Sequence, residues 1–123
     1  MINETEFDQL VVEALDGLPP EFADMLDNVE VIVLPRPGPE HRRAVNIRPW
    51  QTLYGLYQGV PLTKRTHHYG LVAPDTIFIF REPLLRNFRT AEALRAQVRR
   101  TVLHELAHHF GISDERLREL GAY

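Results

Sequence analysis

Apolar residues recur at the spacing of an amphipathic helix in the first part of the chain. Over residues 4–16 they stand three and four positions apart, and Gly17 followed by two prolines ends the pattern. The apolar stripe consists of Phe7, Leu10, Val11, Ala14 and Leu15. We expect a helix over residues 4–16 whose stripe enters the core, then a short helix over about residues 21–27 opened by Pro20.

Three apolar runs predict β-strands. Residues 29–34 are rich in β-branched side chains, and residues 76–80 form a continuous apolar run typical of a buried strand. Residues 53–63 are similar but contain two glycines and a proline, which suits an edge strand better than a central one. An edge strand of this kind offers a place for an extended peptide to pair.

Polar segments connect these runs. Residues 35–49 contain four prolines and a glycine, so we expect a long surface loop in which His41 is solvated. Residues 64–70 are also polar, and His67 and His68 within them are expected to be exposed rather than to bind metal.

The C-terminal part of the chain is predicted to be mainly helical. A short helix over about residues 83–88 precedes a long one over about residues 91–110, for which Thr90 and Glu92 supply a favourable N-terminus. A last helix is expected from Ser113 or Asp114 to about Leu120.

Length and composition narrow the class of protein. The 123 residues suit a single domain, 1–123, with one hydrophobic core. The net charge is −3 and the basic residues are scattered, which gives no support to nucleic-acid binding. Cysteine is absent, so disulfides and thiolate zinc sites are excluded. The acidic N-terminus and the lack of a long apolar run lead us to expect a cytoplasmic protein without a membrane partner.

The chemistry of the chain is concentrated at the end of the long helix. His104 and His108 stand one helical turn apart on the same face, the spacing at which two imidazoles hold one metal ion, and Glu105 flanks them. Glu105 is the only formal charge between residues 101 and 110, so this end of the helix is expected to be buried on most sides. Buried imidazoles and a buried carboxylate need partners, and His-Glu-x-x-His is the zinc signature of hydrolases.

A third ligand is expected where the chain turns back. Gly111 supplies the left-handed residue that ends a helix, and Asp114 follows His108 by six positions. Asp114 would also suit the first turn of a helix capped by Ser113, so Glu115 and Glu119 remain alternative ligands. His109 lies about 100° around the helix from His108, which favours a place in the core or in support of the ligands.

Three segments together resemble the small bacterial zincin-like metallopeptidase family, whose members are minimal zincins. They are residues 55–63, residues 74–77 and the motif from His104 to Asp114. The resemblance implies an α+β, minimal zincin-like fold: a short mixed sheet packed on the active-site helix, with N- and C-terminal helices and an edge strand along the cleft. It also implies Zn²⁺ bound by His104, His108 and Asp114, with Glu105 as the general base.

The sequence departs from the larger zincin classes. A metzincin would carry histidine at Asp114 and a methionine after the motif, whereas Met1 and Met25 both precede it. A gluzincin takes its third ligand from a glutamate far downstream, but only fifteen residues follow His108. The variant with aspartate as the third ligand fits best.

These residues predict a zinc-dependent metallopeptidase that acts on peptides or unfolded protein segments. Glu105 would take a proton from water and return it to the leaving amine, and Tyr57, His68 or Tyr69 would be candidates to stabilise the oxyanion. The alternative is a catalytically weak or inactive zincin-like module that binds peptides or partner proteins. Glu105 favours the enzyme, the short sequence after the motif favours the module, and hydrolysis of another amide or an ester is a third possibility.

Overall fold

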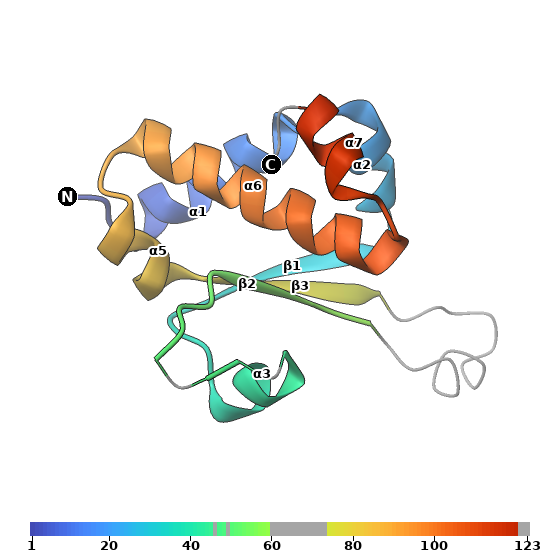
Figure 1. The fold of residues 1–123 in the computed structure, drawn as a ribbon. Coiled ribbons are helices and arrows are strands. Elements are labelled where there is room, and N and C mark those ends of the chain that lie inside the picture. Colours follow the sequence, from blue (N-terminus) through green and yellow to red (C-terminus); the bar gives the residue numbers. More distant parts are fainter. Residues whose placement is uncertain (46, 49, 60–73, 121–123) are drawn as a thin grey trace.

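The computed structural model describes residues 1–45, 47–48, 50–59 and 74–120 (Figure 1). In chain order the elements are α1 (Glu4–Asp16), α2 (Pro20–Met25), β1 (Val29–Leu34), α3 (Pro39–Ala44), β2 (Gly55–Gln58), β3 (Asp75–Phe80), α5 (Arg81–Asn87), α6 (Ala91–Phe110) and α7 (Asp114–Glu119). The predicted bounds of α1, β1 and α6 are confirmed. The expectations for residues 60–73, including those for His67, His68 and Tyr69, lie outside the described residues.

The three strands form one mixed sheet in the order β1-β3-β2. Strand β1 runs parallel to β3 with Val29 opposite Asp75, and β2 runs antiparallel to β3 with Gly55 opposite Ile79. The continuously apolar run is therefore the central strand, and the run interrupted by glycines lies at an edge, as the sequence predicts. With its helices, the sheet confirms the predicted α+β, zincin-like fold.

The core lies between the sheet and a layer of helices. Helices α1 and α6 pack on each other above the sheet, α2 and α7 lie near the C-terminal end of α6, and α3 lies below the sheet (Figure 1). The fully buried side chains include Phe7 and Ala14 of α1, Ile77 and Ile79 of β3 and Val98 of α6. Each buried large apolar side chain contributes about 1.5–3 kcal/mol, so this layer fixes where α6 lies.

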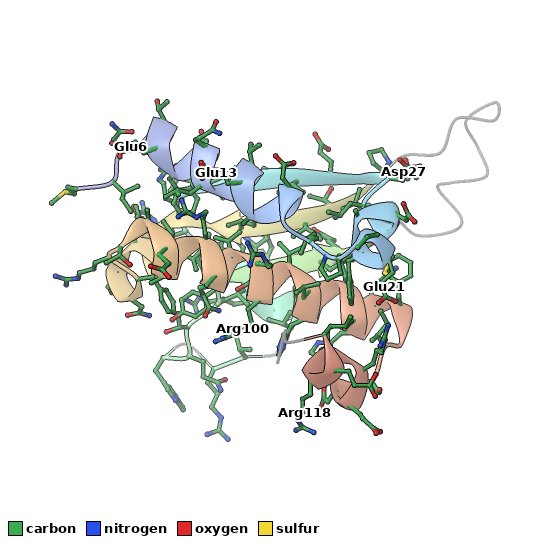
Figure 2. The ribbon with its side chains drawn as sticks, turned by 90° about the horizontal axis from the view of Figure 1, so that it is seen from above. Glu6, Glu13, Glu21, Asp27, Arg100 and Arg118 are labelled. Atoms are coloured by element: carbon green, nitrogen blue, oxygen red, sulfur yellow. The ribbon has the colours of Figure 1, made fainter. Side chains whose placement is uncertain are left out.

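The outer side of the helical layer is polar. Figure 2, seen from above, labels Glu6 on α1 and Arg100 on α6, and both are exposed. Side chains cap the N-termini of α1 and α6. Asn3 Oδ1 accepts from Glu6 N at 2.8 Å, and Thr90 Oγ1, at the predicted start of α6, accepts from Ala93 N at 3.1 Å. Within the described part of the chain, every helix is too short or too polar to cross a membrane.

The expectation of a surface loop is wrong for residues 39–44, which form α3. Proline is tolerated in the first turn of a helix, where its missing N–H costs nothing. His41 is only 9% exposed, so its predicted solvation is also wrong. Its Nδ1 accepts from Gly38 N at 2.8 Å, and its ring centroid lies 4.8 Å from that of Phe78 and 5.2 Å from that of Phe80. His41 thus packs against the face of the sheet on which α3 lies.

Four further elements differ from the prediction at their ends. Helix α2 covers Pro20–Met25 rather than about residues 21–27, and β3 begins at Asp75 rather than at residue 76. Strand β2 begins at Gly55 rather than at residue 53, and α5 begins at Arg81, directly after β3. Helix α7 begins at Asp114 with Ser113 as its N-cap, since Ser113 Oγ accepts from Arg116 N at 3.1 Å. The predicted terminal helix is therefore confirmed.

Candidate metal centre

The predicted metal ligands His104 and His108 lie in the last two turns of α6. Their ring centroids are 6.3 Å apart, with the ring planes inclined by 69°. Gly111 follows the helix with φ of +72°, the left-handed conformation that the sequence predicts for it. Both imidazoles therefore lie on one stretch of helix, at the point where the chain turns towards α7.

This end of α6 is less buried than expected. Leu103, Leu106 and Ala107 face the core, whereas His108 and His109 are exposed. The expectation of burial on most sides fails because the core takes only one face of the last turns. The imidazole of His108 is therefore accessible to a metal ion from solvent.

Glu105 is held by the edge strand. Its Oε1 accepts a hydrogen bond from the backbone N–H of Tyr57 in β2 at 2.8 Å. Burial raises the pKa of Glu105 above its ordinary value, and the Tyr57 N–H bond and the charges of His108 and His104 act in the opposite direction. A carboxylate whose pKa is raised towards neutrality is a better proton acceptor near pH 7.

The histidines fit zinc in donor type and spacing, since two imidazoles at this separation in sequence belong to the tetrahedral sites that zinc prefers. Asp114 is exposed at the first position of α7. Within the described ranges, no three His, Cys, Asp or Glu side chains come together as a group that could hold a metal ion. His104, Glu105 and His108 thus lie in the last two turns of α6, and Asp114 begins α7. The roles of His104, His108 and Asp114 as metal ligands and of Glu105 as general base stay predictions.

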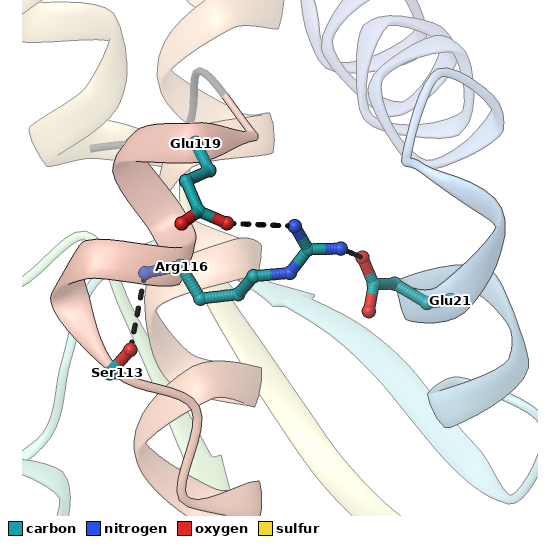
Figure 3. A network of polar contacts seen from close by, with 4 residues as sticks. All are labelled: Glu21, Ser113, Arg116 and Glu119. Carbon is teal, nitrogen blue, oxygen red and sulfur yellow. Dashed lines mark hydrogen bonds and ion pairs between the residues drawn. The ribbon is translucent and has the colours of Figure 1, made fainter.

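Helix α7, which carries Asp114, is tied to α2 by a small polar network (Figure 3). The guanidinium of Arg116 lies 2.9 Å from a carboxylate oxygen of Glu21 and 3.0 Å from one of Glu119. The hydrogen bond that Arg116 donates to Glu119 and the charge of Glu21 raise the pKa of Arg116 above its ordinary value. Leu117, also on α7, is fully buried. Glu119, an alternative ligand in the sequence, is therefore bonded to Arg116.

A second polar cluster lies beside the histidines, and the sequence did not reveal it. The hydroxyl of Tyr57 donates to Asp75 Oδ2 at 2.5 Å, so this hydroxyl, a predicted candidate for the oxyanion, is bonded to a carboxylate. Asp75 is the first residue of β3, and its position directly before the apolar run 76–80 is the one signal in the sequence that could have indicated a role. The other candidates for the oxyanion lie outside the described residues.

His109 belongs to this second cluster. Its ring stacks on that of Tyr57 with centroids 4.0 Å apart and planes inclined by 19°, and its Nε2 lies 3.7 Å from Asp75 Oδ2. The side chain of His109 is 39% exposed, so it is not a core residue. These contacts are with Tyr57 and Asp75, so the expected support of the metal ligands by His109 stays a prediction.

A small α+β domain whose long helix ends in His-Glu-x-x-His, with an edge strand beside the glutamate, defines the zincin class of protein. The family model of zincin-like metallopeptidases matches residues 26–122, and the chain belongs to that family. No curated protein matches the chain. The resemblance drawn from the motif is thus confirmed, and membership points to hydrolase chemistry and to zinc.

Proposed function

We propose that the protein is a zinc-dependent metallopeptidase that hydrolyses peptide bonds in peptides or unfolded protein segments. The observation that carries this proposal is the arrangement at the end of α6, where the Tyr57 N–H fixes Glu105 on the same two helical turns that carry His104 and His108. Membership of the zincin-like metallopeptidase family supports it. His104 and His108 would hold the metal, with Asp114 as the proposed third ligand.

The roles of the residues follow from their chemistry. Zinc, when bound, supplies a Lewis acid that polarises a carbonyl and makes water more acidic. Glu105 accepts the proton of the attacking water and passes it to the leaving amine. The Tyr57 N–H limits the positions of this carboxylate, which reduces the reorganisation that proton transfer requires.

The test combines metal content with cleavage of a library of unstructured peptides. Wild-type protein is expected to bind about one zinc per chain and to cleave the library. Glu105→Gln is expected to keep the zinc and lose about 10²–10⁴-fold in rate, since general-base catalysis contributes that much. His104→Ala is expected to lose both the metal and the activity. The control is Glu30→Gln, which removes the same charge from an exposed position of β1.

Each contrary result has a definite meaning. Unchanged turnover in Glu105→Gln would remove the general-base assignment. Zinc-loaded wild-type protein that binds library peptides without cutting them would favour the alternative, a non-hydrolytic zincin-like module. Protein that takes up no zinc would leave the peptidase proposal without support.

A further inference from the structure

Strand β2 and helix α6 lie side by side in a shared register. The first contact is at Gly55, where a Cβ atom would lie 2.7 Å from Thr101 Cγ2 of the helix. The second is the hydrogen bond from Tyr57 N to Glu105, which lies two residues further along the strand and four residues further along the helix. Two strand residues span about 6.6 Å and four helical residues about 6.0 Å, so contacts at these intervals can repeat along both elements.

A third contact continues the same register. A Cβ atom on Gly59 would lie 3.5 Å from His109 Cε1, again two strand residues and four helical residues further on. Phe80 N donates to Tyr54 O, so alternate residues of β2 bond β3 and the Tyr57 N–H points away from β3. Glu105 therefore binds the edge of the sheet, and its position depends on where β2 lies along α6.

Asp75 contacts both β2 and α6. Its side chain is only 12% exposed, and a carboxylate that is largely buried must be hydrogen-bonded to be stable there. Asp75 begins the central strand β3, receives the Tyr57 hydroxyl from β2 and lies next to His109 at the end of α6. One carboxylate thereby joins β3, β2 and α6.

We infer that Asp75 is a positioning residue for Glu105 and that it acts through the side chain of Tyr57. Asp75 accepts the hydrogen bond of the Tyr57 hydroxyl, and the ring of His109 stacks on one face of the Tyr57 ring. With the ring fixed at both its hydroxyl and its face, the Tyr57 backbone N–H stays directed at Glu105 Oε1. The importance of this for hydrolysis rests on the proposed function, but the positioning itself requires neither metal nor substrate.

The test measures hydrogen exchange of the residue 57 amide by NMR in the metal-free protein. Tyr57→Phe removes the hydroxyl and keeps the ring and the amide, and Asp75→Ala removes the carboxylate. Each is expected to lower the protection factor of that amide about tenfold, as loss of one hydrogen bond would. Asp75→Asn keeps an acceptor for the hydroxyl and is expected to restore most of the protection.

Tyr54→Phe is the matched control. It also removes a bonded phenolic hydroxyl, since Tyr54 Oη accepts from Asn87 Nδ2 at 2.6 Å, but it lies before β2 and away from Glu105. In Tyr54→Phe, the backbone amide of residue 57 is expected to exchange at the wild-type rate. The amides of Ile77 and Ile79 in β3 report general loosening and are expected to stay unchanged.

Two results would overturn the inference: unchanged protection at residue 57 in Tyr57→Phe, or equal loss across Ile77, Ile79 and residue 57. Should Asp75→Ala fail to fold, Tyr57→Phe and Asp75→Asn still decide the matter. Because the measurement involves no zinc and no cleavage, its outcome is independent of whether the protein proves to be a peptidase.

Discussion

At the scale of single residues, Glu105 carries a carboxyl group whose burial disfavours its charged form and whose position is fixed by a hydrogen bond. Burial disfavours its charge, and the hydrogen bond from Tyr57 N offsets only part of that cost, so its pKa is raised in the folded, metal-free protein. The folded state then binds this proton more tightly than the unfolded chain does. The stability gained is fully present below about pH 4.5, the ordinary value for this carboxyl, and is lost as the pH rises through the raised value.

Glu105→Gln tests this linkage. The amide oxygen can still accept from Tyr57 N, but no charge forms at high pH. Urea unfolding of metal-free protein between pH 4.5 and 7 is expected to give a difference in free energy of unfolding that grows with pH in favour of the variant. Glu115→Gln, at an exposed site, is expected to show no comparable trend. A difference for Glu105→Gln that shrinks with rising pH would contradict the raised pKa.

The sequence identifies some of these residues and not others, for a physical reason. His104, Glu105 and His108 stand out because helical spacing alone fixes their relation. Asp75 acquires its partners from residues 18 and 34 positions away, and His41 packs on Phe78 and Phe80 of another element. Contacts between distant segments leave no periodic pattern in the chain.

At the scale of elements, the closeness of β2 and α6 depends on Gly55. A Cβ atom there would lie 2.7 Å from Thr101 Cγ2 and 3.0 Å from the backbone oxygen of Phe78. Thr101 is β-branched and stiff, and a strand carbonyl cannot move alone, so Gly55→Ala is expected to cost about 1–3 kcal/mol of stability. Chemical denaturation measures this loss.

Gly59→Ala is the matched control for Gly55→Ala. A Cβ atom at residue 59 would meet His109 only at an ordinary contact distance of 3.5 Å. Restricting the unfolded chain is expected to make this change neutral or stabilising by about 0.4–1 kcal/mol. Equal destabilisation by both changes would argue against close packing at Gly55.

Helix α7 is held by apolar packing more than by its surface charges. Leu117 is fully buried, and Leu117→Ala is expected to cost about 2–5 kcal/mol. The pair between Arg116 and Glu21 is about half exposed on both sides, so solvent screens it and Glu21→Gln is expected to leave the unfolding free energy nearly unchanged. Thermal or urea unfolding compares the two. A larger loss in Glu21→Gln than in Leu117→Ala would reverse this ranking.

The elements with strong patterns are those that the sequence predicts best. Apolar periodicity, β-branched runs and capping residues identify α1, β1, β3 and α6 because each element alone carries its signal. Helix α3 was missed because its proline, the prolines just before it and its charges resemble a loop, and it is stabilised by the ring of His41 on Phe78 and Phe80. The strand partners and the register were set by tertiary packing and could not be predicted from the single sequence.

At the scale of the whole molecule, α6 links the core to the proposed metal centre. One face of α6, with Leu94 and Val98, is fully buried against the other elements, and its C-terminal end carries His104 and His108. A ligand bound only by the folded state stabilises the entire domain. Zinc at 100 times its dissociation constant is therefore expected to raise the free energy of unfolding by about 2.7 kcal/mol.

Variants of the proposed ligands show how much each residue contributes to the zinc-dependent rise in the free energy of unfolding. His104→Ala is expected to abolish the zinc-dependent rise, because a single remaining histidine on the helix binds zinc poorly. A tenfold loss of affinity in Asp114→Ala would reduce the rise at the same zinc concentration to about 1.4 kcal/mol, which unfolding with and without zinc can measure. Glu115→Ala, an equally charged and exposed neighbour, is the control. If Asp114→Ala behaved as wild type and Glu115→Ala did not, the third ligand would be Glu115, and α7 would have to approach α6 by a different face of its first turn.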